Sequence, residues 1–249
     1  MKILWYGYEK LIGAGFSFSI YGLIMLLSSS FDLFEVSESL SSPMLWAAFY
    51  GYGIYCSIII DGICNVWPML HPWKISLYIA SGFVIFIFLM ANFAYILIAG
   101  TIGTAAALLF YAGMSYFRKR KWISSLFALV LPLIFLAVSI MDFTEKEGWE
   151  VQRQTSSYEV SFTYFNGEHK IPVKLKENQT LMFQADFSVE SGGYGHHAED
   201  QDGDRVPMHE IGDKLALRDV AAGQYYIVIH GDNAKGRVDI DWEIRTKSE

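Results

Sequence analysis

The densest group of chemically active side chains lies between Ser191 and Glu210, in the sequence SGGYGHHAEDQDGDRVPMHE. Histidines and carboxylates follow one another closely here, and both are metal-ligating groups. The candidate metal ligands of this segment are His196, His197, Asp200, Asp202, Asp204, His209 and Glu210.

Three interpretations of this segment stay open. Calcium binding is indicated by the alternating carboxylates, although Arg205 stands where an EF-hand loop requires glycine and Ile211 where it requires glutamate. Zinc binding would use the histidines with a carboxylate, but their spacing is not a recognised short pattern. The third interpretation is a solvated acidic loop between strands.

Asp61 is the second candidate, because it lies within an otherwise apolar run from Met44 to Val66. An ionised side chain in hydrocarbon costs about 2.5 to 3.5 kcal/mol on insertion scales, so such residues are functional candidates by default. Asp61 could bind a proton or cation. It could equally make a polar helix contact or reach interfacial water, since it precedes Trp67 by about one turn.

The chain that must position these groups divides into two halves of different composition. Residues 1–141 hold 7 Lys and Arg and 5 Asp and Glu, whereas residues 142–249 hold 12 and 21. The first half is therefore predicted to be a membrane domain, and the second a water-soluble domain of net charge −9. Both cysteines, Cys56 and Cys64, lie in the first half, so no disulfide holds the second together.

Five membrane-spanning helices are expected in the first half. About 20 apolar residues cross the hydrocarbon core as a helix, and Ile75 to Phe117 is a run of 43 uncharged residues that must fold back once, near Asn92. The expected spans are about 11–29, 44–66, 75–91, 94–117 and 122–141, with Lys10 before the first.

Lysine and arginine predict the orientation of these spans, since cytoplasmic loops carry an excess of them. With five spans, all seven fall on one side: Lys2, Lys10, Lys74, Arg118, Lys119, Arg120 and Lys121. The N-terminus is therefore expected in the cytoplasm and the second half outside it, at the cell membrane.

Small residues recur at four-residue spacing at Ala99, Gly103 and Ala107, and again at Gly15 and Ser19. Such faces allow close helix packing, within the bundle or between copies in a homo-oligomer. Pro132 is expected to kink the last span, because it removes a backbone hydrogen-bond donor.

The second half shows the period-two alternation of half-buried strands, most strictly from Thr180 to Val189 and from Val238 to Ile244. Asn166-Gly167 predicts a hairpin turn. Six or seven short strands of this kind favour an antiparallel β-sandwich of jelly-roll type.

The segment LRDVAAGQYYIVI, Leu217 to Ile229, and the later strand RVDIDWEI resemble the end of bacterial pre-peptidase C-terminal-type β-sandwich domains. The resemblance covers about 30 residues. It implies a sandwich fold outside the cytoplasm, in domains that accompany secreted or surface proteins and are usually not catalytic themselves.

No sequence motif for nucleophilic catalysis or nucleotide binding occurs in the chain, and a net charge of −9 argues against nucleic acid as a partner of the second half. The expected function is that of a membrane protein whose exported β-domain binds an exported protein or a small ligand. The alternatives are a small transporter or ion-coupled protein centred on Asp61, and a metal-dependent membrane enzyme.

Overall fold

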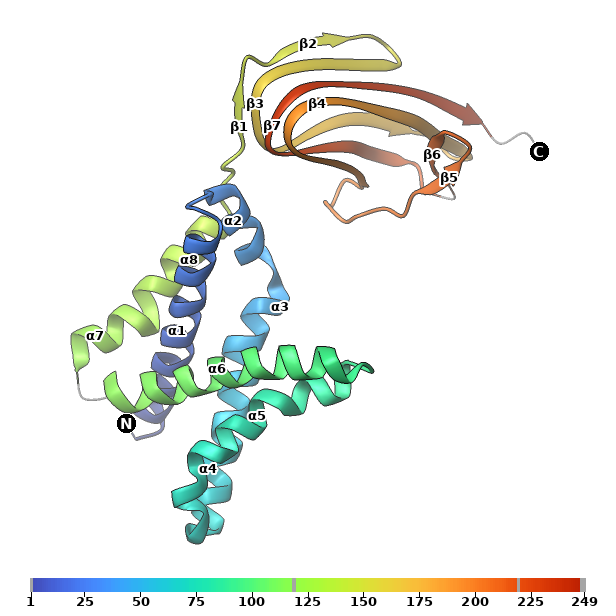
Figure 1. Cartoon of the computed structure of the whole chain (residues 1–249). Helices are drawn as coiled ribbons and strands as arrows, with labels where there is room; N and C mark the ends of the chain where they lie inside the picture. The colour runs from blue at the N-terminus through green and yellow to red at the C-terminus, as the bar shows by residue number, and fades with distance from the viewer. Residues whose placement is uncertain (1, 118–119, 219, 247–249) are drawn as a thin grey trace. The chain divides into compact units, whose positions relative to one another are not determined.

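The computed structural model describes residues 2–117, 120–218 and 220–246 of the chain. It divides into two compact units, Met1–Asp142 and Phe143–Glu249 (Figure 1). The first is helical and the second is made of β-strands.

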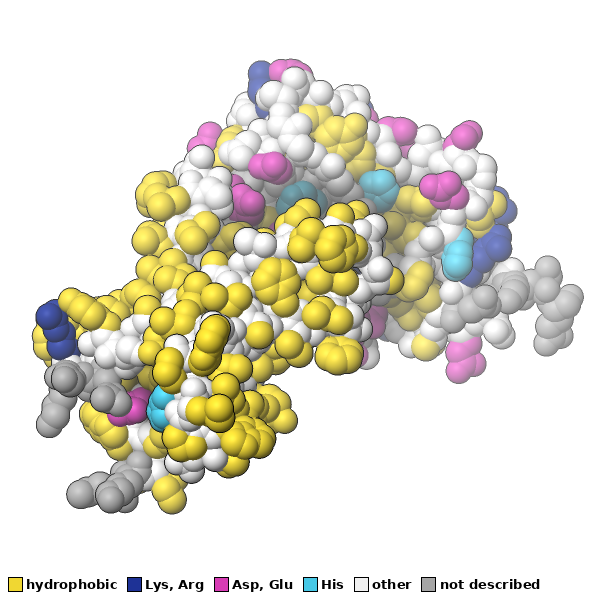
Figure 2. All heavy atoms as spheres, turned by 60° about the horizontal axis from the view of Figure 1, so that its bottom comes forward, with side chains coloured by type: hydrophobic (Ala, Val, Ile, Leu, Met, Phe, Trp, Pro, Cys, Tyr) yellow, Lys and Arg dark blue, Asp and Glu magenta, His cyan; other side chains and the backbone are white. Residues whose placement is uncertain are grey.

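Among the described residues of the first unit, five helices are long and apolar enough to cross a membrane: Ile3–Ser28, Pro43–Val66, Pro68–Leu89, Phe93–Phe117 and Trp122–Ser139. Large apolar side chains cover their outer surfaces, among them Phe88, 83% exposed, and Phe93, 71% exposed. Figure 2 shows hydrophobic side chains spread over the foreground helices. In water this exposure would be unfavourable, and in hydrocarbon it is the expected surface.

The helical unit contains these segments in chain order: α1 (Lys2–Ser28), α2 (Leu33–Ser41), α3 (Pro43–Trp46), η1 (Ala47–Tyr52), α4 (Gly53–Val66), η2 (Pro68–Trp73), α5 (Lys74–Leu89), α6 (Phe93–Phe117), α7 (Lys121–Ser125), η3 (Leu126–Val130) and α8 (Leu131–Ser139). The chain turns back between α5 and α6 at Asn92, whose side chain accepts a hydrogen bond from the Ala94 amide at 2.9 Å.

Small residues let two pairs of helices approach closely. A Cβ added at Gly103 of α6 would meet the Gly82 carbonyl oxygen of α5 at 2.5 Å, and one added at Gly15 of α1 would overlap the Phe127 backbone of η3. Both glycines thus serve contacts within one chain. Whether such faces also join two copies stays a prediction.

A π-helical turn lies directly before Pro132, and the expected kink there stays a prediction. The last apolar helix passes through a π-helical turn, η3, and Pro132 stands in the first turn of α8 directly after it. A π-turn is a known way to absorb a lost i to i−4 hydrogen bond, so the irregularity is spread over Leu126 to Val130.

The second unit is one seven-stranded antiparallel sheet. Its strands are β1 (Glu145–Glu147), β2 (Glu150–Arg153), β3 (Ser157–Leu175), β4 (Gln179–Glu199), β5 (His209–Ile211), β6 (Lys214–Leu217) and β7 (Gly223–Thr246). The order is β1-β3-β7-β4-β6-β5, and β2 also pairs with β3.

Three long strands, β3, β4 and β7, bend together and fold this sheet into two layers (Figure 1). The ladders shift register between Phe162 and Gly167 in β3 and between Val189 and Gly193 in β4. Only Lys176 to Asn178 separate the end of β3 in one layer from the start of β4 in the other. Because this link reaches at most about 14 Å, the two layers must face each other.

Apolar side chains from both layers form one core. Val160, Phe183 and Ile240 come from the first layer and Ile171 and Ile227 from the second, and all are at most 1% exposed. The strict alternation in the sequence gives the inward face of each strand.

Two expectations about this unit are wrong. Asn166-Gly167 is not a hairpin turn, since β3 runs through it and Gly167 pairs with Gly231 of β7. The segment after Ser191 is not all loop, because β4 continues to Glu199. In both places glycine bends a continuous strand, and a bend and a turn use the same residues. The sheet therefore has three long strands where several short ones were expected.

Candidate functional site

Asp61 of α4 lies at the centre of an ion-pair cluster that joins three helices. Its carboxylate oxygens lie 2.5 Å from Lys10 Nζ of α1 and 2.6 Å from Lys74 Nζ of α5. The Tyr6 hydroxyl donates a third contact to the same carboxylate at 3.0 Å. Asp61 thus makes a polar helix contact, which was one of the two roles expected for it.

Lys10 corrects the predicted boundary of the first span. It was expected to precede that span, but α1 begins at Lys2 and the Lys10 side chain is 1% exposed. Its ammonium also donates to Ser57 Oγ at 2.8 Å and lies 3.4 Å from Met114 Sδ. With Asp61, these groups give the buried ammonium three contacts, from α4 and α6.

Two cavities adjoin this cluster. A cavity of about 420 Å³ is lined by Tyr6, Glu9, Asp61, Lys74, Tyr111, Met114 and Ser115. A smaller one of about 170 Å³ has mostly apolar walls and includes Tyr78. Ser57 Oγ lies 2.6 Å from the Tyr78 hydroxyl, so a row of hydrogen bonds runs from Asp61 through Lys10 and Ser57 to the second cavity.

In the β-unit, the alternating aspartates form a turn. Asp200 Oδ1 accepts hydrogen bonds from the backbone amides of Asp202 and Asp204, each at 2.9 Å. This is the usual way in which an aspartate closes a turn on its own backbone. The side chains of Asp202 and Asp204 are exposed.

The four remaining predicted ligands do not form one group in the described residues. His209 and Glu210 are exposed on the short strand β5. His196 and His197 are neighbours in β4 and therefore point to opposite faces of the sheet. His196 packs on Phe187, with ring centroids 5.6 Å apart, and burial, together with the adjacent His197, lowers its pKa.

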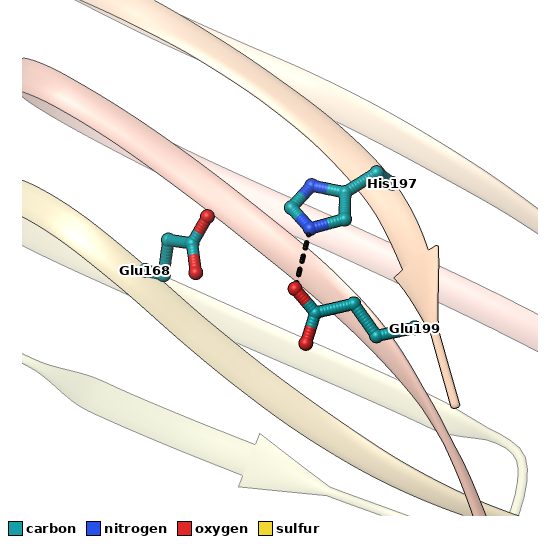
Figure 3. A group of neighbouring side chains, drawn as sticks. All are labelled: Glu168, His197 and Glu199. Carbon is teal, nitrogen blue, oxygen red and sulfur yellow. Dashed lines mark hydrogen bonds and ion pairs between the residues drawn. The ribbon is translucent and has the colours of Figure 1, made fainter. Parts of the chain in front are cut away.

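Only His197 belongs to a cluster of metal-ligating groups among the described residues (Figure 3). It lies with Glu199 of β4 and Glu168 of β3, and one ligand atom from each falls within 4.8 Å of the others. His197 Nε2 is 2.9 Å from Glu199 Oε1, and Lys170 forms an ion pair with the other Glu199 oxygen. The seven predicted residues do not come together as one site.

His169 is a second histidine whose pKa is lowered, and it lies on the inward face of β3. Lys146 Nζ lies 3.1 Å from Nδ1, the Tyr158 hydroxyl lies 2.7 Å from Nε2, and Trp149 packs edge-on against the ring. Burial, with the charges of Lys146 and Arg153, lowers the pKa of His169 to about 4. The imidazole is therefore neutral at pH 7.

One edge of the β-unit is open. β6 pairs with β4 only from Leu181 to Phe183, so Gln184 to His197 have a strand partner on the β7 side alone in the described part of the sheet. Beside this edge is a hollow of about 500 Å³, lined by Ala185, Asp186, Phe187, Tyr194, Gly195 and His196. Phe187 and Tyr194 stack within it at 4.7 Å between ring centroids.

Comparisons with known protein families and with curated proteins find no match for this chain.

Sequence reasoning missed Lys10 and Lys74 as partners of Asp61, and Glu168 and Lys170 as neighbours of His197. Glu9 and Lys10 are the only charged residues in the sequence from Ile3 to Ser30, which was a usable signal. Glu168 and Lys170 share a strand face by alternation, but only the β3-β7-β4 register brings that face to His197.

Proposed function

We propose that this chain is an integral membrane protein that crosses the cell membrane five times and holds its β-unit outside the cytoplasm as a binding module. Five apolar helices support this topology. In the sequence, Lys2, Lys74 and the cluster from Arg118 to Lys121 all fall on one side of the five expected spans, which supports it as well. The observation that carries the binding role is the open edge of β4.

An edge strand with unpaired backbone groups can accept an extended peptide as an additional strand. Between Gln184 and Val189, the inward side chains Ala185, Phe187 and Val189 are only partly buried. No strand of the described residues pairs with β4 on the open side there. Tyr194 is 56% exposed beside them. A peptide strand paired here would cover these groups and place an apolar side chain in the hollow.

The expected partner is an extended, basic segment of an exported protein. The β half carries a net charge of −9, so lysine or arginine at alternate positions of the peptide would be attracted to it. The resemblance to secreted β-sandwich domains, which are usually not catalytic, supports the same role.

The test uses the full chain in detergent and a labelled nine-residue peptide of alternating lysine and valine. We expect binding that weakens with salt, and slower amide hydrogen exchange between residues 184 and 197. The same peptide with alternate amides N-methylated keeps its charge but cannot pair as a strand. Equal binding of the two peptides, or protection confined to other strands, would refute strand addition.

Side-chain variants test the hollow separately. Tyr194→Ala should weaken peptide binding, and Tyr164→Ala, a tyrosine of β3 outside the hollow, should not. A loss of binding in both variants would point to general destabilisation, which circular dichroism would show directly.

A second function, ion-coupled transport, is favoured by the hydrogen-bonded row that links the two cavities of the helical unit. In liposomes with an entrapped pH indicator, proton flux should be present in the natural chain and lost in Asp61→Asn. Retained flux in that variant, with Glu38→Gln as an exposed control, would exclude Asp61 from this role.

A further inference from the structure

The cluster of Glu168, His197 and Glu199 brings three ligand groups from two different strands to one face of the sheet. Figure 3 shows the Glu168 carboxylate turned toward the bonded pair of His197 and Glu199. The side chains of His197 and Glu199 are 15% and 9% exposed. The strand β7 lies between their strands, so the sheet itself fixes the backbone positions of all three.

Two of the three side chains are already held by contacts within the sheet. His197 Nε2 lies 2.9 Å from one oxygen of Glu199, and Lys170 forms an ion pair with the other. One imidazole and two carboxylates on one face are the ligand types that divalent transition metals take in proteins.

We propose that Glu168, His197 and Glu199 bind a divalent transition metal of the zinc class. His197 Nε2 and one oxygen of each glutamate would be the three protein ligands, with water at a fourth position. One imidazole and two carboxylates suit zinc, whereas calcium takes six to eight oxygens. This inference does not depend on the proposed peptide binding.

The geometry requires only side-chain adjustment. Ligand atoms around tetrahedral zinc lie about 3.3 Å apart, given metal-ligand distances of about 2.0 to 2.2 Å, and here they lie within 4.8 Å. Lys170 is the competitor, because it already contacts Glu199, and its side chain is 46% exposed and free to turn to solvent.

Substitution of Lys170 distinguishes a metal site from a cluster that only stabilises the sheet. Lys170→Met removes the competing cation and should tighten zinc binding. Glu168→Gln, which keeps the size of the side chain, and His197→Ala should each weaken it about tenfold or more. His209→Ala and Glu210→Gln alter the same segment outside the cluster and should leave the affinity unchanged.

The experiment titrates the chelator-treated full chain in detergent with Zn²⁺, and with Ca²⁺ for comparison, by calorimetry. Replacement with Co²⁺ reports tetrahedral geometry through its visible absorption. Zinc binding with the stated order of variants supports the proposal. Absence of zinc binding, or equal loss in His209→Ala and His197→Ala, would overturn it. Should His197→Ala fail to fold, Glu168→Gln and Lys170→Met still decide the question, because they must shift the affinity in opposite directions.

Discussion

The buried side chain of Lys10 has the carboxylate of Asp61 as its counter-ion. Its side chain is 1% exposed, and its ion pair is with Asp61. Taking two ions out of water costs several kcal/mol each, which mutual attraction and additional hydrogen bonds must offset. The cluster therefore links α1, α4 and α5, because its ion pairs join all three helices.

Removal of the Asp61 charge should destabilise the helical unit strongly. Asp61→Asn leaves Lys10 buried and without its counter-ion, a change that costs about 3 to 5 kcal/mol in comparable buried pairs. Thermal unfolding in detergent measures the loss. The double variant Lys10→Met with Asp61→Asn should recover part of it, and Glu38→Gln, which changes an exposed carboxylate, should unfold like the natural chain. An Asp61→Asn protein of unchanged stability would contradict the packing role.

His169 should make the β-unit less stable in acid. Its pKa is lowered to about 4 in the folded unit, while an unfolded histidine titrates near 6.5. Below about pH 6.5 the unfolded chain binds the proton first, so stability falls from there down to about pH 4 and then levels off. A shift of this size corresponds to about 3 kcal/mol.

Denaturant unfolding of the β-unit at several pH values tests this expectation. His169→Gln removes the titrating group and should flatten the decrease between pH 6.5 and pH 4. His209→Ala changes an exposed histidine and should not. A decrease that is identical in all three proteins would assign the acid sensitivity to other groups.

At the scale of single residues, the sequence identified Asp61 and His197 but not their partners. An isolated aspartate in an apolar run is visible in the sequence because its cost does not depend on the fold. The partners are a tertiary property. Lys10 is 51 positions from Asp61, and Glu168 reaches His197 only through the register of β7.

At the scale of elements, the bends of the long strands depend on glycine at particular positions. Gly192 of β4 has φ of +89°, a conformation that other residues rarely adopt, and an added Cβ would overlap the backbone of Asn233 and Ala234. A side chain at this position must either strain the bend or separate β4 from β7.

Gly192→Ala should therefore destabilise the β-unit by about 1 to 3 kcal/mol. Gly195→Ala is the matched control from the same strand, because nothing lies within 4 Å of its added Cβ. Urea unfolding of both variants, followed by tryptophan fluorescence, gives the comparison. Equal stability of the two variants would mean that the bend does not depend on this residue.

Glycines within the long strands explain why the strands could be predicted only in part. Alternation located the inward faces from Thr180 to Val189 and from Val238 to Ile244, since that pattern is local. It did not distinguish a bend from a turn at Asn166-Gly167, because both need glycine, and the choice rests on pairing with Gly231. The long apolar helices were easier, because hydrocarbon thickness sets their length.

At the scale of the whole molecule, the proposed topology predicts which bonds a protease reaches. In intact cells, trypsin should digest the β-unit but leave the basic cluster from Arg118 to Lys121 uncut. In inverted membrane vesicles the pattern should reverse. Immunoblots with an N-terminal tag distinguish the fragments, and cleavage at the basic cluster in intact cells would contradict the orientation.

β7 is the last strand of the β-unit along the chain, yet it lies between β3 and β4 and pairs with both over nearly their whole length. During synthesis, β3 and β4 therefore emerge without the strand that joins them. Until Gly223 to Thr246 have followed, each of these two long strands presents an unpaired edge on the side that β7 later occupies, and this edge remains open to aggregation. Assembly of the β-unit must then wait until β7 has been made, long after the first helices. A chain that lacks β7 should be a substrate for quality-control proteases rather than a smaller folded protein.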